Sequence, residues 1–190
     1  MAKKSDKAKK GEGKKAKKAE AVGGVDAANP HVLRARNIGA MQQTFSHPWN
    51  PNSQITGVQL SRQLGLKRAG VSIARIAPGK ESFVPHAHHR EEEWLYILMG
   101  EGLALIGEEN VRVGAGDFIA FPAPQVTHHL TNVGGEDLVY LMGGEHAKMD
   151  VVDFPTLAKR TVRLGDRVTV YDAESGVELS MPKPAKKAKK

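Results

Sequence analysis

The sequence of 190 residues contains no cysteine. A disulfide framework, a zinc site built on thiolates and a cysteine nucleophile are therefore all excluded as the basis of its structure or chemistry. A purely structural zinc ion is disfavoured for the same reason, because such sites commonly close their coordination shell with cysteine.

Long apolar segments are also missing from the chain. No run of eighteen apolar residues is present to span a bilayer, and residues 1–10 mix lysine with small residues where a secretory signal would have an apolar stretch. From these two absences we expect a cytoplasmic protein with no transmembrane segment.

Positive charge is concentrated at the two ends of the chain. Residues 1–20 and 183–190 contain fourteen lysines and three acidic residues, a net charge of +11, so the rest of the chain carries −4 of the overall +7. Segments rich in Lys, Ala and Gly have almost nothing apolar to bury, which leaves the entropy cost of ordering them without compensation. We expect disordered tails at residues 1–29 and 183–190, with a single domain at 30–182 between them.

Two interpretations of these tails stay open. Polylysine attracts nucleic acid, anionic lipid or polyphosphate through the release of counterions, without sequence selectivity. The alternative is a solubilising extension with no partner. Because the tails contain no aromatic residue to stack on bases, the first interpretation implies only weak and salt-sensitive contact.

Between the tails, short apolar runs alternate with Gly, Pro and Asp clusters at intervals of roughly eight to twelve residues, which is typical of a sandwich or barrel of many strands. No segment there sustains a helical period. We therefore expect an all-β domain in which Trp94, Tyr96 and Tyr140 mainly serve packing and residues 45–54 form an ordered loop. Strands are predicted at 70–77, 94–99, 103–106, 118–121 and 138–142, with a late strand at 168–171.

Five of the eight histidines lie in two short clusters, PHAHH at 85–89 and THH at 127–129. In a strand, residues i and i+2 face the same side, so His86 and His88 can aim at one point while His89 faces away. Convergent imidazoles on adjacent positions of one face are what a metal ion needs from neighbouring ligands.

A carboxylate follows these histidines after a polar bend. Glu93 opens the next apolar strand, where an ionised side chain is costly to bury unless it is paired or binds a cation. Glu91 and Glu92 are expected to be solvated within the bend, with Glu92 as the alternative to Glu93 as a ligand.

The run from Pro78 to Asn132 resembles the two signature motifs of the cupin superfamily. The first motif, G-x5-H-x-H-x3,4-E-x6-G, fits except that six residues rather than five precede its first histidine. The second, G-x5-P-x-G-x2-H-x3-N, has Pro124 at its second glycine and one extra residue before its histidine. The matching positions are Gly79, His86, His88, Glu93 and Gly100 in the first motif and Gly116, Pro122, His128 and Asn132 in the second.

The resemblance implies a double-stranded β-helix, or jelly-roll, barrel that holds one divalent metal ion on His86, His88, Glu93 and His128. His128 keeps the motif's spacing to Asn132, and His129 is the alternative for the fourth ligand. Three imidazoles and one carboxylate leave about two positions open in an octahedral shell, as Fe, Mn, Ni or Co prefer, although Zn or Cu can occupy the same ligands.

The wider likeness covers roughly residues 30–172 and is to a group of single-domain, conserved-barrel bacterial cupins, and it brings no particular reaction with it. We expect a metal-dependent enzyme that acts on a small polar molecule, with dioxygenase, isomerase and lyase chemistry all open. The alternative is a non-catalytic sensor or small-ligand-binding cupin that its lysine tails tether to nucleic acid or another polyanion. Exposed strand edges favour a homodimer in either case.

Overall fold

The structure, a computed structural model, describes residues 25–26, 29–124, 126–177 and 179. It is built mainly from short antiparallel strands, as the spacing of turn residues predicts. The strands are β1 (Val25–Asp26), β2 (Asn29–Leu33), β3 (Gln43–Phe45), β4 (Ile55–Val58), β5 (Ala69–Ile76), β6 (Ala87–His88), β7 (Glu93–Met99), β8 (Glu101–Ile106), β9 (Glu109–Gly114), β10 (Phe118–Phe121), β11 (His128–Thr131), β12 (Leu138–Glu145), β13 (Met149–Phe154), β14 (Lys159–Leu164) and β15 (Arg167–Asp172).

Helices are few and short. They are α1 (Ala35–Ile38), η1 (Gly39–Met41), α2 (Leu60–Gln63), η2 (Pro155–Leu157) and η3 (Ala173–Ser175). No helix in the described part of the chain is long and apolar enough to cross a membrane.

The predicted tails lie almost entirely outside the described residues. Of residues 1–29, only Val25, Asp26 and Asn29 are described, and they form the antiparallel pair of β1 and β2. The second predicted tail, residues 183–190, is wholly outside the described part.

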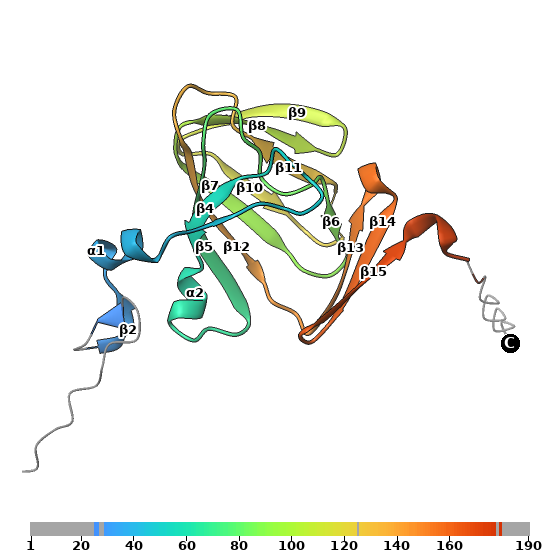
Figure 1. The fold of residues 1–190 in the computed structure, drawn as a ribbon, viewed down its shortest axis with the longest axis horizontal. Helices are drawn as coiled ribbons and strands as arrows, with labels where there is room; N and C mark the ends of the chain where they lie inside the picture. Colours follow the sequence, from blue (N-terminus) through green and yellow to red (C-terminus); the bar gives the residue numbers. More distant parts are fainter. Residues whose placement is uncertain (1–24, 27–28, 125, 178, 180–190) are drawn as a thin grey trace, which may run out of the picture.

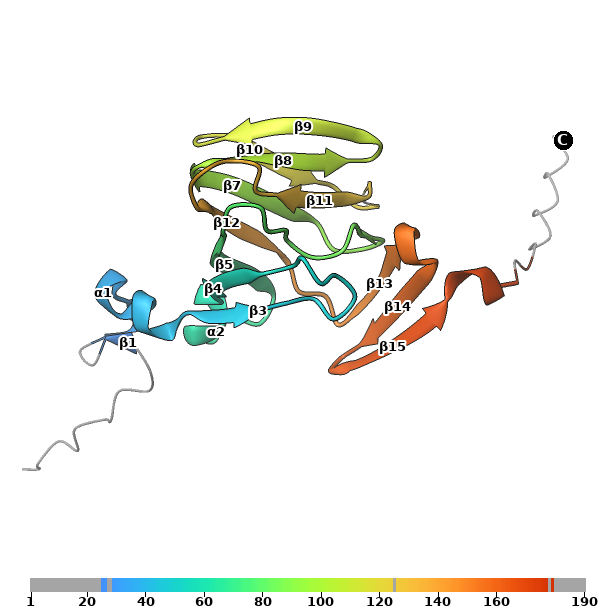
Figure 2. The same ribbon diagram turned by 45° about the horizontal axis from the view of Figure 1, so that its top comes forward.

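Two sheets face each other and enclose the core. The larger has six strands in the order β10-β7-β12-β5-β4-β3, and the smaller has three in the order β11-β8-β9. Figures 1 and 2 show β8, β9 and β11 lying as a separate layer over β7 and β10. This all-β arrangement is the jelly roll that the motifs imply.

Inward-facing side chains from both sheets fill the core. Tyr140 of β12 stands between its paired neighbours Ala74 of β5 and Ile97 of β7, and all three are almost fully buried. Leu130 of β11 and Ala104 of β8, also buried, face them from the smaller sheet. Burying an Ile or Leu side chain stabilises the fold by about 1.5–3 kcal/mol each, so this layer anchors the strands that carry the site.

A four-stranded sheet, β15-β14-β13-β6, joins the C-terminal segment to the barrel. The join is short, since β13 pairs with β6 only through Val152 opposite His88 and Asp153 opposite Ala87. Strands β13–β15 project from one side of the barrel, away from the N-terminal segment (Figures 1 and 2). The predicted late strand is β15, whereas β13 and β14 were not predicted.

Candidate metal centre

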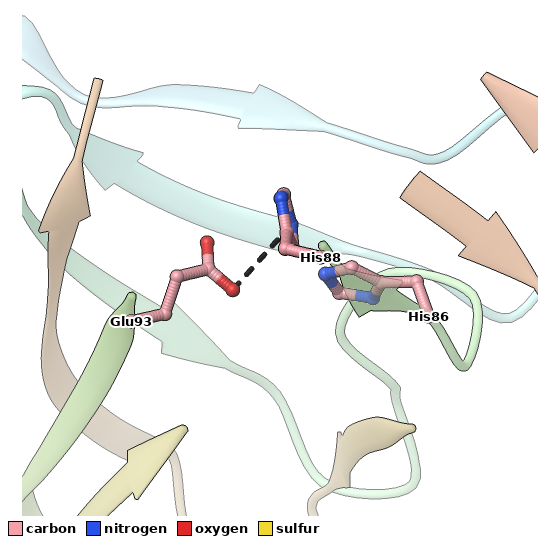
Figure 3. A group of neighbouring side chains, drawn as sticks. All are labelled: His86, His88 and Glu93. Atoms are coloured by element: carbon pink, nitrogen blue, oxygen red, sulfur yellow. Dashed lines mark ion pairs between the residues drawn. The ribbon is translucent and has the colours of Figure 1, made fainter. Parts of the chain in front are cut away.

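Three of the predicted ligands converge at one end of the barrel. His88 lies in β6, His86 directly precedes that strand, and Glu93 is the first residue of β7. The ligand atoms of these three residues all lie within 4.8 Å of one another. Figure 3 shows Glu93 facing the two imidazoles, with the His88 Nε2 3.5 Å from the Glu93 Oε2.

The fourth predicted ligand, His128, reaches the same carboxylate from β11. Its Nε2 lies 3.3 Å from the Glu93 Oε2, and its residue is only 7% exposed. Its ring centroid is 4.4 Å from that of His86 but 6.5 Å from that of His88, so His128 stands outside the tightest group of three. Stacking on Phe121, at 3.9 Å between centroids, fixes the ring in this place.

The two neighbouring histidines make their side-chain contacts elsewhere. The His89 Nε2 lies 2.8 Å from the Asp153 Oδ2 on the exposed side of β6 and β13, as strand alternation predicts. The His129 Nε2 lies 3.4 Å from the Glu81 Oε2, and its Nδ1 lies 3.4 Å from the Ser82 hydroxyl oxygen. Neither imidazole contacts Glu93, so the geometry places His128 rather than His129 beside the other three.

Each converging histidine has its Nδ1 held by an oxygen that only accepts hydrogen bonds. The distances are 2.8 Å from His86 to the Val84 carbonyl oxygen and 3.2 Å from His128 to the Val126 carbonyl oxygen. The His88 Nδ1 lies 2.5 Å from the Asp150 Oδ2. In the neutral form of each ring these acceptors favour the proton on Nδ1, which leaves the Nε2 lone pair available, and this is the tautomer that a metal ion needs.

The charge state of the cluster suits a cation. Burial opposes ionisation of Glu93, but the adjacent His128 side chain and the neighbouring imidazoles of His88 and His86 outweigh it and lower the pKa of this carboxyl to about 2. Burial, followed by the charges of His128 and His88, lowers the pKa of His86 to about 3. Near neutral pH the cluster therefore offers an ionised carboxylate and a neutral imidazole, the forms that bind metals.

Behind His88 lies a buried network that the sequence did not reveal. Asp150 of β13 is 0% exposed and also accepts a hydrogen bond from the Arg90 backbone N–H at 3.1 Å. Arg163 of β14 forms an ion pair with Glu91 and lies 3.9 Å from the Asp150 carboxylate. Asp150 and Arg163 thus orient a predicted ligand from a part of the fold distant in sequence.

The expectation that Glu91 is solvated is wrong. Glu91 is 5% exposed, pairs with Arg163 and accepts a hydrogen bond of 2.6 Å from the Ala147 backbone N–H. The physical reason is that β14 brings a cation to this bend, and no local pattern in the sequence signals that approach. Glu92 is exposed, as expected.

Gly144 allows Glu93 to sit at the cluster. The two residues are opposite each other in the pairing of β12 and β7. A Cβ atom at Gly144 would lie 2.6 Å from the Glu92 carbonyl oxygen and 3.0 Å from the Glu93 Cγ, which is too close for any other residue. The absence of a side chain at Gly144 therefore leaves the space that the Glu93 side chain occupies.

A cavity of about 200 Å³ opens beside the cluster. Apolar side chains form most of its wall, and His86, Glu93 and His128 form one end. Tyr140, which we expected to serve packing, also borders it. Its other lining residues include Phe83, Leu95, Ala104, Phe121, Leu130 and Met142. A second hollow of about 370 Å³, toward β3 and β4, shares Ser72, Phe83 and Met142 with the first.

Comparisons with known proteins agree with this fold. Residues 72–144 match the family model described as a cupin domain. A crystal structure of a candidate sugar phosphate isomerase from Acidithiobacillus ferrooxidans is 33% identical, with 80% of this chain and 98% of that chain covered and a TM-score of 0.77. A sugar phosphate isomerase from a cupin superfamily, from Silicibacter pomeroyi, shares the fold at 17% identity, covering 74% of this chain and 90% of that one with a TM-score of 0.64.

Among curated proteins, the chain is similar to the rhicadhesin receptor of Pisum sativum. The two are 30% identical over 148 residues. The match covers 74% of this chain and spans 64% of the receptor's own length.

Proposed function

This chain belongs to the cupin superfamily, and on that premise we propose that it is a metal-dependent enzyme acting on a small molecule. His86, His88, Glu93 and His128 would hold one divalent ion, chosen from Fe, Mn, Ni, Co, Zn and Cu. The ion would act as a Lewis acid toward an oxygen atom of the substrate.

One observation carries this proposal. Three imidazoles present their Nε2 atoms to one ionised carboxylate while an acceptor oxygen holds each Nδ1. A merely structural histidine cluster has no need for three rings in the same tautomer, whereas ligation requires it. The donor set therefore fits a divalent ion that accepts nitrogen and oxygen ligands.

The chain's own residues would divide the remaining work. Asp150 keeps the His88 ring in position, and Phe121 does the same for His128 through ring stacking. The apolar side chains of the cavity wall lower the local dielectric constant, which strengthens electrostatic interactions with a bound molecule. Glu93, with its lowered pKa, stays ionised as a ligand and is therefore a poor general acid.

Among the reaction classes left open by the sequence, the name of the Acidithiobacillus relative supports an isomerase. We test the proposal with the protein loaded with each divalent metal in turn and offered hydroxycarbonyl compounds, whose isomerisation is followed by proton NMR. Turnover that needs metal and disappears in Glu93→Gln supports the enzyme. Stoichiometric binding with no turnover by any metal form would favour the sensor or binding module instead.

For assembly, we propose a homodimer through the outer face of β7 and β10. Phe118 is 62% exposed there beside Tyr96 and Leu98, and β10 is the edge of the six-stranded sheet. An exposed edge with an apolar face suits a second copy of the same sheet. Sedimentation of Phe118→Glu against the wild type tests this.

Cytoplasmic location and contact of the lysine tails with polyanions are also proposals, and the tails lie outside the described residues.

A further inference from the structure

Tyr140 borders the cavity at the depth of the barrel core. Along the inner face of β12, Gly144 is opposite Glu93, Met142 is opposite Leu95 and Tyr140 is opposite Ile97. The tyrosine therefore stands two layers below the carboxylate, while its side chain still lines the same cavity. The cavity thus extends from the histidine cluster to a phenol.

The hydroxyl of Tyr140 has no hydrogen-bond partner among the described residues, although the residue is only 2% exposed. Its strand partners Ala74 and Ile97 offer no polar side-chain atom. Burial raises the pKa of this phenol, so it is a neutral donor and acceptor. Buried polar groups are nearly always hydrogen bonded, and an orphaned one is a position where a ligand atom belongs.

The charge of the cavity wall restricts what that ligand is. None of the described residues lining the cavity is a lysine or an arginine, and three of them are glutamates. Arg163, which lies behind one of these, is already paired with Glu91 and close to Asp150. When the carbonyl and hydroxyl oxygens of a ligand occupy the proposed ion, a phosphate group at the other end of the molecule, with about two negative charges at neutral pH, would lose its hydration without gaining a cationic side chain.

We propose that this cavity binds a small uncharged hydroxycarbonyl compound and rejects its phosphorylated form. Adjacent carbonyl and hydroxyl oxygens face the histidine end, a further oxygen hydrogen bonds to the Tyr140 hydroxyl, and the carbon chain lies against Leu95 and Met142. The cavity is smaller than the 300–1,000 Å³ of drug-sized pockets, which suits a molecule of a few carbons. The inference rests on the proposed function because the oxygen-binding end requires the metal ion.

The test uses the full chain loaded with Mn(II), with metal content measured first. Dihydroxyacetone and dihydroxyacetone phosphate serve as probes, because they differ only in the phosphate group. Paramagnetic relaxation of the probe protons, followed by NMR titration, reports binding near the manganese even when affinity is weak. Protein loaded with Zn(II) gives the diamagnetic baseline.

Dihydroxyacetone should give saturable relaxation, and its phosphate should bind at least tenfold more weakly. Tyr140→Phe should weaken dihydroxyacetone binding about fivefold, the effect of one lost hydrogen bond. The matched substitution Tyr96→Phe, on the outer face of β7, should leave binding unchanged. Since the Tyr140 hydroxyl has no hydrogen-bond partner in the described part of the chain, Tyr140→Phe should melt at or above the temperature of the wild type.

Three results would overturn the inference and leave the proposed function standing. They are equal or tighter binding of dihydroxyacetone phosphate, no binding of either probe to metal-loaded protein, and unchanged dihydroxyacetone binding by Tyr140→Phe. A marked loss of thermal stability in Tyr140→Phe would also overturn it, because the hydroxyl would then serve the fold. Failure of the chain to take up manganese or any other divalent ion would contradict the proposed function itself, and the inference with it.

Discussion

His88 and Asp150 are 62 residues apart in the sequence, yet the His88 Nδ1 and the Asp150 Oδ2 lie 2.5 Å from each other. The Asp150 carboxylate fixes which nitrogen of the His88 ring carries the proton. It also makes the other nitrogen a stronger electron-pair donor to a metal ion. A second pair, the His89 Nε2 and the Asp153 Oδ2, lies at 2.8 Å on the exposed side of the place where β6 meets β13. One histidine–aspartate pair thus serves the cluster, while the other faces solvent.

Asp150→Asn should weaken metal binding by about tenfold. Without the negative charge, the His88 Nε2 becomes less basic and the ring is held less firmly in its orientation. Titration of the metal-free protein with Mn(II) or Ni(II) in competition with a chelator measures the effect. Asp153→Asn makes the same change beside His89 and should leave the metal affinity at the wild-type value. Equal losses in both variants would mean that neither aspartate acts through a ligand.

Arg163→Met should lower the free energy of unfolding by about 3 kcal/mol, since it leaves Glu91 and Asp150 buried without their cation. Arg160, three residues before Arg163 in β14, pairs with Asp153 at the surface. Its replacement by Met should cost less than about 1 kcal/mol. Urea denaturation of both variants gives the comparison, and a cost for Arg160→Met as large as that for Arg163→Met would remove the distinction between the two pairs.

Glu81 offers a test of stability against pH. Burial raises its pKa, but hydrogen bonds from Asn52 and Asn50 and the charge of His129 outweigh this and lower the pKa below 4.5. The ionised form therefore stabilises the fold above pH 4.5, and the effect is lost as pH falls through the lowered value.

Glu81→Gln should accordingly lower the free energy of unfolding by about 1 kcal/mol at pH 7. The difference in stability between the variant and the wild type should close as the pH falls below 4.5. Thermal melts from pH 7 to pH 3 follow the gap. Glu108→Gln, in an exposed turn, is the control and should show no gap at any pH. A gap for Glu81→Gln that stays constant down to pH 3 would contradict the assignment of the effect to the carboxylate's charge.

Much of the barrel could be predicted because its signals are local. The predicted strand at 118–121 coincides with β10, that at 94–99 begins one residue after the start of β7, and that at 70–77 is shifted by one residue from β5. Three motif glycines, Gly79, Gly100 and Gly116, have φ values of +72°, +80° and +97°, a conformation open mainly to glycine. Asn132 is fully buried and donates to the carbonyl oxygens of Ile76 and Glu136, which explains its motif position.

Residues that act through tertiary contact could not be predicted in the same way. Glu91 has the surroundings of a surface bend in the sequence and becomes buried only because Arg163 arrives from β14. Asp150 carries no local signal of its role, because no sequence feature within ten residues of it points to His88 as its partner. That the Tyr140 hydroxyl borders a cavity, with no hydrogen-bond partner among the residues described, is visible only in the folded structure.

The metal content of the purified chain tests the central claim most directly. Elemental analysis beside circular dichroism melts should find about one divalent ion per wild-type chain and almost none in His86→Ala and Glu93→Ala, both still folded. His128→Ala should lose far more metal than His129→Ala, and His89→Ala should keep the wild-type amount. Full metal content in folded His86→Ala and Glu93→Ala, or a larger loss from His129→Ala than from His128→Ala, would contradict the proposed centre.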